Sequence, residues 1–352
     1  MFRDAKYLIA YIAPLAGYLG IYYGGVWSFG SIYVGFVLIP IIEQLLPKST
    51  ENFPPEVEEK RVVARFFDVL LYLNIPILYG LIGFFFYRIS LGGLATYEIV
   101  GMICNVGLVI GTSGINVGHE LGHRSNAFEQ TLGKILLLPA LYMHFFIEHN
   151  RGHHKNVATP LDPASARLGE SLYAFWLRSV AGGYWNAWQL EAERLKKLDR
   201  PVVSWSNEML RFQVFQLGYL AAVALVWSWS MLPFAIAIAV FGFLMLESVN
   251  YIEHYGLRRQ LLPTGRYENV GPQHSWNSDH ELGRIFLYEL TRHSDHHYKA
   301  TRKYQVLRHF DESPQLPWGY PASIIASLLP PLWFGMMNRR VKKSSATERM
   351  MA

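Results

Sequence analysis

The chain has 352 residues, of which 51% are hydrophobic and only 17% are charged, well below the roughly 25% charge of soluble domains, so it has the composition of a membrane protein. Its single cysteine, Cys104, excludes an internal disulfide framework and a four-cysteine iron site. The net charge of +5, without a separate basic stripe, favours contact with anionic lipid or an acidic protein over nucleic acid.

Six apolar segments approach the roughly 20 residues that a membrane-spanning helix needs. In chain order they are residues 7–25, 28–46, 66–87, 96–118, 211–228 and 231–252. Very short turns at 25–28 and 228–231 predict that the segments flanking each turn pair as antiparallel helical hairpins. We therefore expect an all-α integral membrane protein with six transmembrane helices, in one domain that covers residues 1–352.

Two weaker apolar runs need separate treatment. The run 131–147 is short, and the run 320–337 contains Pro330 and Pro331, which break a helix interior. Lysine and arginine are concentrated before the first segment, between the second and third, and in the long stretch from His119 to Arg211, which predicts that these parts and both termini are cytoplasmic. Because 131–147 would place later motifs on the opposite side if it crossed, we predict that it is interfacial or re-entrant.

Nine histidines lie in four short motifs near the ends of the apolar segments. The motifs are HELGHR, EHNRGHH, NYIEHYG and RHSDHH, and their histidines are His119, His123, His149, His153, His154, His254, His293, His296 and His297. Neutral imidazole is a strong ligand for iron, copper and zinc, and nine exceed the need of one four-coordinate ion. The motifs therefore predict two metal ions where the protein meets water.

The spacing within the motifs supports this interpretation. His119 and His123 are four residues apart, so on a helix they share one face. The neighbours His153 and His154 would diverge by about 100° on a helix, which suits two adjacent ions better than one, and the same holds for His296 and His297. HELGH also fits a zinc-protease pattern, but a protease would leave most of the other histidines unexplained.

Other residues near the motifs receive supporting roles. Four acidic residues that adjoin the histidines are expected to orient the ligands: Glu120, Glu148, Glu253 and Asp295. Four further histidines lack a partner at ligand spacing and are not assigned to the metals: His144, His274, His280 and His309. A metal transporter would place ligands within broken helices at the middle of the bilayer, whereas these motifs lie outside the apolar runs.

A nitrogen-rich site without thiolates suits iron, copper or zinc. A hydrophobic channel between membrane helices would suggest an apolar substrate, and oxidation of its unactivated C–H bonds by dioxygen favours an iron pair. In order and spacing, the four motifs resemble those of the integral-membrane alkane 1-monooxygenases, which are related to the xylene monooxygenases and the membrane fatty-acid desaturases. NYIEHYG discriminates best, because desaturases carry other motifs. The family commonly has Gln before RHSDHH, where this chain has Thr291, and that difference leaves the ligands intact.

The resemblance implies terminal hydroxylation of medium-length n-alkanes to primary alcohols by O2 at a non-haem di-iron centre, held by the nine histidines in the inner membrane and facing the cytoplasm. It implies electrons from NAD(P)H through a reductase and rubredoxin, which must lie outside this chain because CxxC pairs are absent. Basic residues that either dock an acidic rubredoxin or contact lipid headgroups are Arg124, Arg151, Lys155, Arg302 and Lys303.

The substrate is expected to enter a channel lined by the second, fourth and sixth helices. In the fourth helix, Gly107, Gly111 and Gly114 either leave space for the alkane or permit close helix packing. The main alternative activities are a fatty-acyl desaturase or hydroxylase, which needs recognition of an acyl head group, and a xylene-type monooxygenase.

Overall fold

The computed structural model describes residues 2–351, and this part of the chain is helical, with three isolated β-bridges and no strand. Five helical segments are long and apolar enough to cross a membrane: Gly25–Leu45, Arg65–Ser90, Thr96–Gly122, Glu208–Val226 and Trp229–His254. They correspond to the second through sixth segments predicted from the sequence. The first, 7–25, is helical but is not one of the five, so the structure supports an all-α membrane protein and leaves the sixth span a prediction.

The N-terminal half supplies most of these segments. It contains η1 (Phe2–Tyr11), α1 (Ile12–Tyr23), η2 (Gly25–Phe29), α2 (Gly30–Tyr33), η3 (Val34–Leu38), α3 (Ile39–Leu45), α4 (Pro55–Val62), α5 (Arg65–Tyr72), α6 (Asn74–Ser90), α7 (Thr96–Val109), η4 (Ile110–Ile115) and α8 (Asn116–Gly122). α1 ends at Gly24, whose φ of 62° favours glycine, and α2 then packs beside α1 as the predicted hairpin requires.

The central part contains the weak apolar run. Its elements are α9 (Ala127–Leu137), η5 (Leu138–Ala140), α10 (Phe145–Glu148), η6 (His149–His153), α11 (His154–Asn156), α12 (Leu172–Lys197), α13 (Glu208–Val226), η7 (Trp229–Met231) and α14 (Leu232–His254). The run 131–147 is divided among three short elements and is not among the spanning candidates, which agrees with an interfacial or re-entrant position.

The C-terminal part consists of short elements followed by one longer helix: η8 (Pro272–His274), α15 (Glu281–Phe286), α16 (His293–Tyr298), η9 (Tyr304–Val306), α17 (Tyr320–Ser327) and α18 (Pro330–Met351). The helix break predicted at the proline pair is confirmed, because α17 ends at Ser327 and Pro330 begins α18, a position that tolerates the missing N–H.

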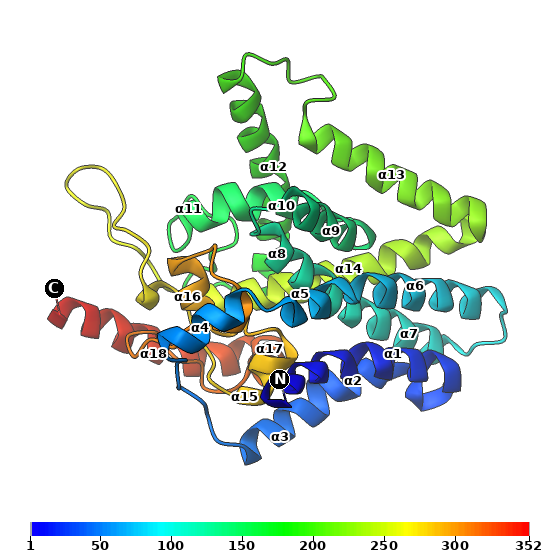
Figure 1. The fold of residues 1–352 in the computed structure, drawn as a ribbon, viewed down its shortest axis with the longest axis horizontal. Helices are drawn as coiled ribbons and strands as arrows, with labels where there is room; N and C mark the ends of the chain where they lie inside the picture. Colours follow the sequence, from blue (N-terminus) through cyan, green and yellow to red (C-terminus); the bar gives the residue numbers. More distant parts are fainter. Residues whose placement is uncertain (1, 352) are drawn as a thin grey trace.

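The arrangement brings distant motifs to one place. α7 packs against both α6 and α14, while α8, α10, α11 and α16 gather near the ends of these long helices (Figure 1). Two of the motif-bearing stretches contain a π-helical turn, η4 directly before α8 and η6 at His149–His153. Such wider turns rotate the residues that follow them and occur often at functional sites.

Candidate metal centre

All nine predicted histidines converge, and they form two separate groups. One group, called here the five-histidine group, contains His119, His123, His149, His154 and His296. The other, the four-histidine group, contains His153, His254, His293 and His297. Within each group the candidate ligand atoms all lie within 4.8 Å of one another, so each group can hold a metal ion.

The groups divide the adjacent histidines between them. His153 belongs to the four-histidine group and His154 to the other; likewise His297 and His296 are separated. This is the arrangement predicted from the divergence of neighbouring helical residues. α16 and the η6–α11 turn therefore each supply ligand candidates to both groups, whereas α8, which carries His119, supplies only the five-histidine group and α14, which carries His254, only the other.

The distances fit metal coordination. In the five-histidine group, the Nε2 atoms of His119 and His296 are 2.9 Å apart and those of His149 and His123 are 3.1 Å apart. In the four-histidine group, the Nε2 atoms of His297 and His293 are 2.9 Å apart. Two nitrogens bound at right angles, each about 2.1 Å from one ion, would be about 3.0 Å apart. The Nε2 atoms are therefore placed as the corners of a coordination shell.

The electrostatic environment favours neutral rings, the form that binds metals. Burial, followed by the charge of neighbouring histidines, holds the pKa of His123, His149 and His154 well below its usual value. The same causes lower the pKa of His293, His296 and His297. Each ring thus keeps a lone pair available inside a buried site.

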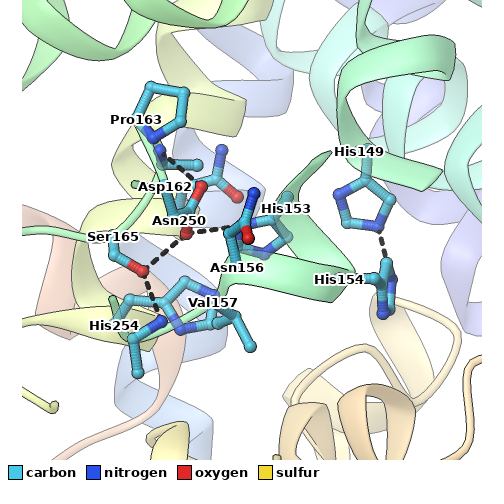
Figure 2. A network of polar contacts seen from close by, with 12 residues as sticks. His149, His153, His154, Asn156, Val157, Asp162, Pro163, Ser165, Asn250 and His254 are labelled. Atoms are coloured by element: carbon cyan, nitrogen blue, oxygen red, sulfur yellow. Dashed lines mark hydrogen bonds and ion pairs between the residues drawn. The ribbon is translucent and has the colours of Figure 1, made fainter. Parts of the chain in front are cut away.

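His153 differs because it has a carboxylate partner. Burial alone would lower its pKa, but the charge and hydrogen bond of Asp162, whose Oδ2 is 2.9 Å from its Nδ1, outweigh burial and raise the pKa. Ser165 donates to the same carboxylate oxygen at 2.6 Å, and the turn that carries Asp162 folds back over the histidine (Figure 2). A carboxylate in this position fixes the tautomer and directs Nε2 toward the group.

Sequence reasoning missed Asp162. It lies nine residues after His153, beyond the spacing that a helical pattern can relate. The available signal was the sequence TPLDPAS after the histidines, because aspartate between two prolines predicts a tight turn that can bring a carboxylate back over the preceding helix.

The four carboxylates that were expected to orient ligands have different partners. Glu253 lies beside the four-histidine group: its Oε2 is 3.2 Å from Nε2 of His293, the nitrogen that faces the group, and its Oε1 accepts a hydrogen bond from Tyr320 at 2.8 Å. Glu148 accepts a hydrogen bond from Asn186. The remaining two contact basic residues, Glu120 with Arg124 and Asp295 with Arg302.

The five basic residues expected at a docking surface also differ in exposure. Arg124 is buried between Glu120 and Asp68. Arg302 and Lys303 are half-buried in ion pairs with Asp295 and Asp68. Arg151 is held by Glu191 and Glu208, while Lys155 is exposed at the surface. Lys155 is therefore the most accessible positive charge of the five.

An apolar cavity leads to the histidines. Its walls come from the second, fourth and sixth predicted segments, including Phe36, Leu108 and Met245, and it ends at His119, His149 and His293, which belong to both histidine groups. Of the three glycines expected in a channel, the lining includes Gly111. A side chain at Gly107 would meet Phe241, and one at Gly114 would meet Leu78 and the backbone of Leu136, so these two positions serve close helix packing.

Comparison with known proteins agrees with the site. A family model described as Fatty acid desaturase matches residues 99–324. The chain is 41% identical to Alkane 1-monooxygenase 1 of Alcanivorax borkumensis over 88% of this chain and 78% of that protein. It is 40% identical to Alkane 1-monooxygenase 2 of Pseudomonas aeruginosa over 99% of this chain and 95% of that protein. It is 26% identical to the xylene/toluene monooxygenase hydroxylase component of Pseudomonas putida, over 95% of this chain and 88% of that protein.

The family model covers more than half of the chain, and the two alkane 1-monooxygenases match the chain over most of its length. In the structure, two groups of imidazoles lie at the end of an apolar cavity. The chain therefore belongs to the fatty acid desaturase family and, within it, to the alkane 1-monooxygenases.

Proposed function

We propose that this enzyme hydroxylates the terminal carbon of medium-chain n-alkanes at a non-haem di-iron centre, using O2 and electrons delivered by rubredoxin. The observation that carries the proposal is the apolar cavity that ends between the two histidine groups. An unbranched alkane has no polar group to recognise, so a narrow apolar cavity selects it by burial and shape.

In this proposal the five-histidine group holds one iron and the four-histidine group holds the other. The fit rests on the donor set, because neutral imidazoles with Nε2 atoms about 3 Å apart match the nitrogen shell of a first-row metal. When bound there, a pair of redox-active iron ions would supply the activation of O2 that oxidation of an unactivated C–H bond requires. Asp162 orients His153, and Tyr320 holds Glu253 beside His293.

The cavity walls would position the alkane. Leu108, Thr112 and Asn116 follow one another at helical spacing toward His119, and the residues of α14 that line the cavity lead similarly toward Glu253. From Leu108 to His119 the helix rises about 16 Å at 1.5 Å per residue. An alkane lying along this face would present its terminal methyl group to the histidines, and the apolar walls would exclude bulk water from the reaction.

The proposal also includes the orientation of the protein in the membrane and its electron donor. With six spans, both termini and all four histidine motifs face the cytoplasm of the inner membrane, where NAD(P)H, rubredoxin reductase and rubredoxin are accessible. Rubredoxin would dock on the face that carries Lys155, beside the half-buried His123 and His154 of the five-histidine group.

Replacement of Lys155 tests the docking surface. We expect Lys155→Ala to raise the KM for rubredoxin about fivefold while leaving kcat unchanged, because one exposed charge contributes about 1 kcal/mol to encounter with an acidic partner. Lys197→Ala is the matched control, since Lys197 is exposed at the end of α12, which projects away from the histidines (Figure 1). Equal KM values for the two variants would remove Lys155 from the docking surface.

The activity itself is tested by gas chromatography–mass spectrometry on membranes that contain this chain, supplied with NADH, rubredoxin, its reductase and n-octane or n-dodecane. We expect a 1-alkanol that carries oxygen from isotopically labelled O2. Absence of alkanol from iron-loaded protein would contradict the proposal, and conversion of an acyl lipid or of a methyl-substituted arene in the same membranes would assign the desaturase or the xylene-type activity instead.

A further inference from the structure

A second, smaller cavity lies next to the substrate cavity and has the opposite character. It lies between α10, α12 and α14, with Tyr142, His144, Ser179 and Glu247 among the residues that line it. Phe145, His149 and Asn250 line both cavities and so form the wall between them. We call this second cavity the polar chamber.

The polar chamber contains a buried carboxylic acid that the proposed ligand sets do not use. Glu247 is 3% exposed and lies within a membrane-spanning helix. Its Oε1 accepts a hydrogen bond from Tyr142 at 2.8 Å, and its Oε2 accepts one from Ser179 at 2.6 Å and one from Asn250 at 3.4 Å. An ionisable group in a membrane helix is costly, so its retention indicates a function.

Two successive ring contacts lead from the chamber, through His144, to the partly exposed Tyr184. The ring of His144 lies 4.2 Å from that of Tyr142 and 5.2 Å from that of Tyr184, measured between ring centroids. Tyr184 is 38% exposed. The hydroxyl, imidazole, carboxyl and amide groups that line the chamber supply the two to four hydrogen-bond partners that a buried water molecule needs.

The proposed reaction consumes protons, which must reach the buried histidine groups. Alkane, O2, two electrons and two protons give alcohol and water: one C–H bond is replaced by a C–O bond, the O–O bond breaks, and the second oxygen leaves as water with the two protons. Rubredoxin supplies the electrons. Most of the substrate cavity wall is apolar and offers protons few partners, whereas the chamber behind His149 and Asn250 is lined by hydrogen-bonding groups.

We propose that the polar chamber is the path for these protons, with water in the chamber and Glu247, supported by Tyr142 and Ser179, relaying protons from the surface near Tyr184 to the wall formed by His149 and Asn250. This inference rests on the proposed function. It makes Glu247 a relay residue that passes protons toward the centre without touching the substrate. The alternative is that Glu247 only ties α12 and α14 to the segment before α10.

Water access to the chamber is tested without metal or activity. In a Cys104→Ser background, Gly183→Cys would place a thiol in the chamber, where the nearest atom to the new Cβ is 3.8 Å away. Thr112→Cys is the control in the substrate cavity. We expect 2-aminoethyl methanethiosulfonate, which carries a positive charge, to modify the chamber thiol at least tenfold faster. Equal rates, with both thiols accessible to uncharged methyl methanethiosulfonate, would overturn the proposal.

The relay itself is tested by turnover in H2O and D2O. We expect Glu247→Gln to lower the rate of alkanol formation about tenfold, less than the roughly hundredfold that a positioned acid contributes, because water can carry part of the flux. The solvent isotope effect should rise above that of the wild type, and Glu247→Asp should restore part of the rate. Glu43→Gln removes another buried carboxyl of a spanning helix and is the matched control.

The outcomes separate this inference from the proposed function. If the wild type produces no alkanol, the proposed function fails, whatever the labelling shows. If the wild type produces alkanol but Glu247→Gln matches Glu43→Gln in rate and isotope effect, the relay is wrong and the function stands. Iron content and thermal stability of each variant identify loss of folding, and in that case the labelling of Gly183→Cys decides the proposal.

Discussion

The two histidine groups are close in space but differ in burial and in support. All members of the four-histidine group are buried, whereas His123 and His154 of the five-histidine group are half-buried. Among the nine ligand candidates, the His–carboxylate ion pairs found in the described residues belong to the four-histidine group, through Asp162 and Glu253. The four-histidine group, called the inner group below, thus has fewer imidazoles and more carboxylate contacts. The five-histidine group, called the outer group below, has more imidazoles and fewer such contacts.

This difference indicates a division of labour. In the four-histidine group His153 is held from two sides, because Asp162 fixes its Nδ1 while its Nε2 faces the group, so this ring changes little when its surroundings move. A half-buried set lies nearer to an approaching electron donor. We infer that the four-histidine group holds its metal more firmly and that the five-histidine group is nearer to the point of electron entry.

The largest effect should come from removing one histidine of each group. His296 and His297 are adjacent on α16 but belong to different groups. We expect both alanine variants to lose alkane oxidation and to retain membrane insertion. His297→Ala leaves three imidazoles and should lose about half of the bound metal, whereas His296→Ala leaves four, enough for a tetrahedral shell, and should lose less. Metal analysis of purified protein checks this, and full activity in either variant would remove that residue from the ligand set.

Replacement of Asp162 should weaken only the inner group. Asp162→Asn removes the charge that orients His153, and loss of such a partner lowers metal affinity about 10- to 100-fold. Competition with a chelator, followed by metal analysis, should then show that the inner ion is released earlier than in the wild type. Asp279→Asn is the control, because Asp279 is also buried and contacts a histidine, His309, outside both groups. Equal effects of the two variants would contradict the role of Asp162.

The groups should also differ in their response to pH. The pKa of His153 is raised above 6.5, so near neutrality a metal must displace a proton from it, and affinity for the inner group should rise with pH until the pH exceeds that raised pKa. The lowered pKa values of His123, His149, His154 and His296 mean that these rings are already neutral at pH 6.5, so the affinity of the outer group should not change above this pH.

The size of this pH effect is about tenfold in affinity per pH unit for one displaced proton. Titration of metal-free protein between pH 6.5 and 8 would measure it. Asp162→Asn should remove the dependence, since the carboxylate is what raises the pKa of His153. A pH dependence of equal slope for both ions would contradict the distinction between the groups.

The smallest effect is expected from a substitution in the cavity wall, which should leave both histidine groups intact and change only the preferred substrate. Leu108 lines the cavity far along the helix from His119. Leu108→Phe should shift the product distribution toward shorter alkanes by about tenfold, since one or two methylene contacts contribute about 1–3 kcal/mol to discrimination. Val100→Phe is the control, because Val100 is 47% exposed on the outer surface of α7. An unchanged distribution with normal metal content would exclude Leu108 from the substrate path.

Much of the site could be predicted from local spacing. HELGHR and RHSDHH place histidines three or four residues apart, and helical geometry predicted that His296 and His297 suit two neighbouring ions better than one; in the structure they lie in different groups. The structure also confirmed the break at Pro330 and placed 131–147 outside the spanning candidates. These predictions succeeded because each depends on residues within one or two helical turns.

Long-range features were less predictable. Asp162 reaches His153 through a turn, and Glu253 contacts His293 although the two are forty residues apart in sequence. Gly111 lines the cavity and Gly114 does not, although they lie three residues apart near a π-helical turn that rotates one against the other. The first apolar segment, 7–25, was predicted to span the membrane but is not among the five spanning candidates. Its helix begins with ten residues of narrower 3₁₀ geometry, which the apolar pattern did not predict.

The sequence by itself determined that this chain is a helical membrane protein with nine clustered histidines, because apolar length and imidazole spacing are local properties of the chain. The tertiary structure established which imidazoles lie in the same group, which carboxylates reach them, and that one wall separates an apolar cavity from a polar chamber. Those facts depend on how α7, α12, α14 and α16 pack against one another. Packing of distant helices is a cooperative property of the whole core, which no local pattern specifies.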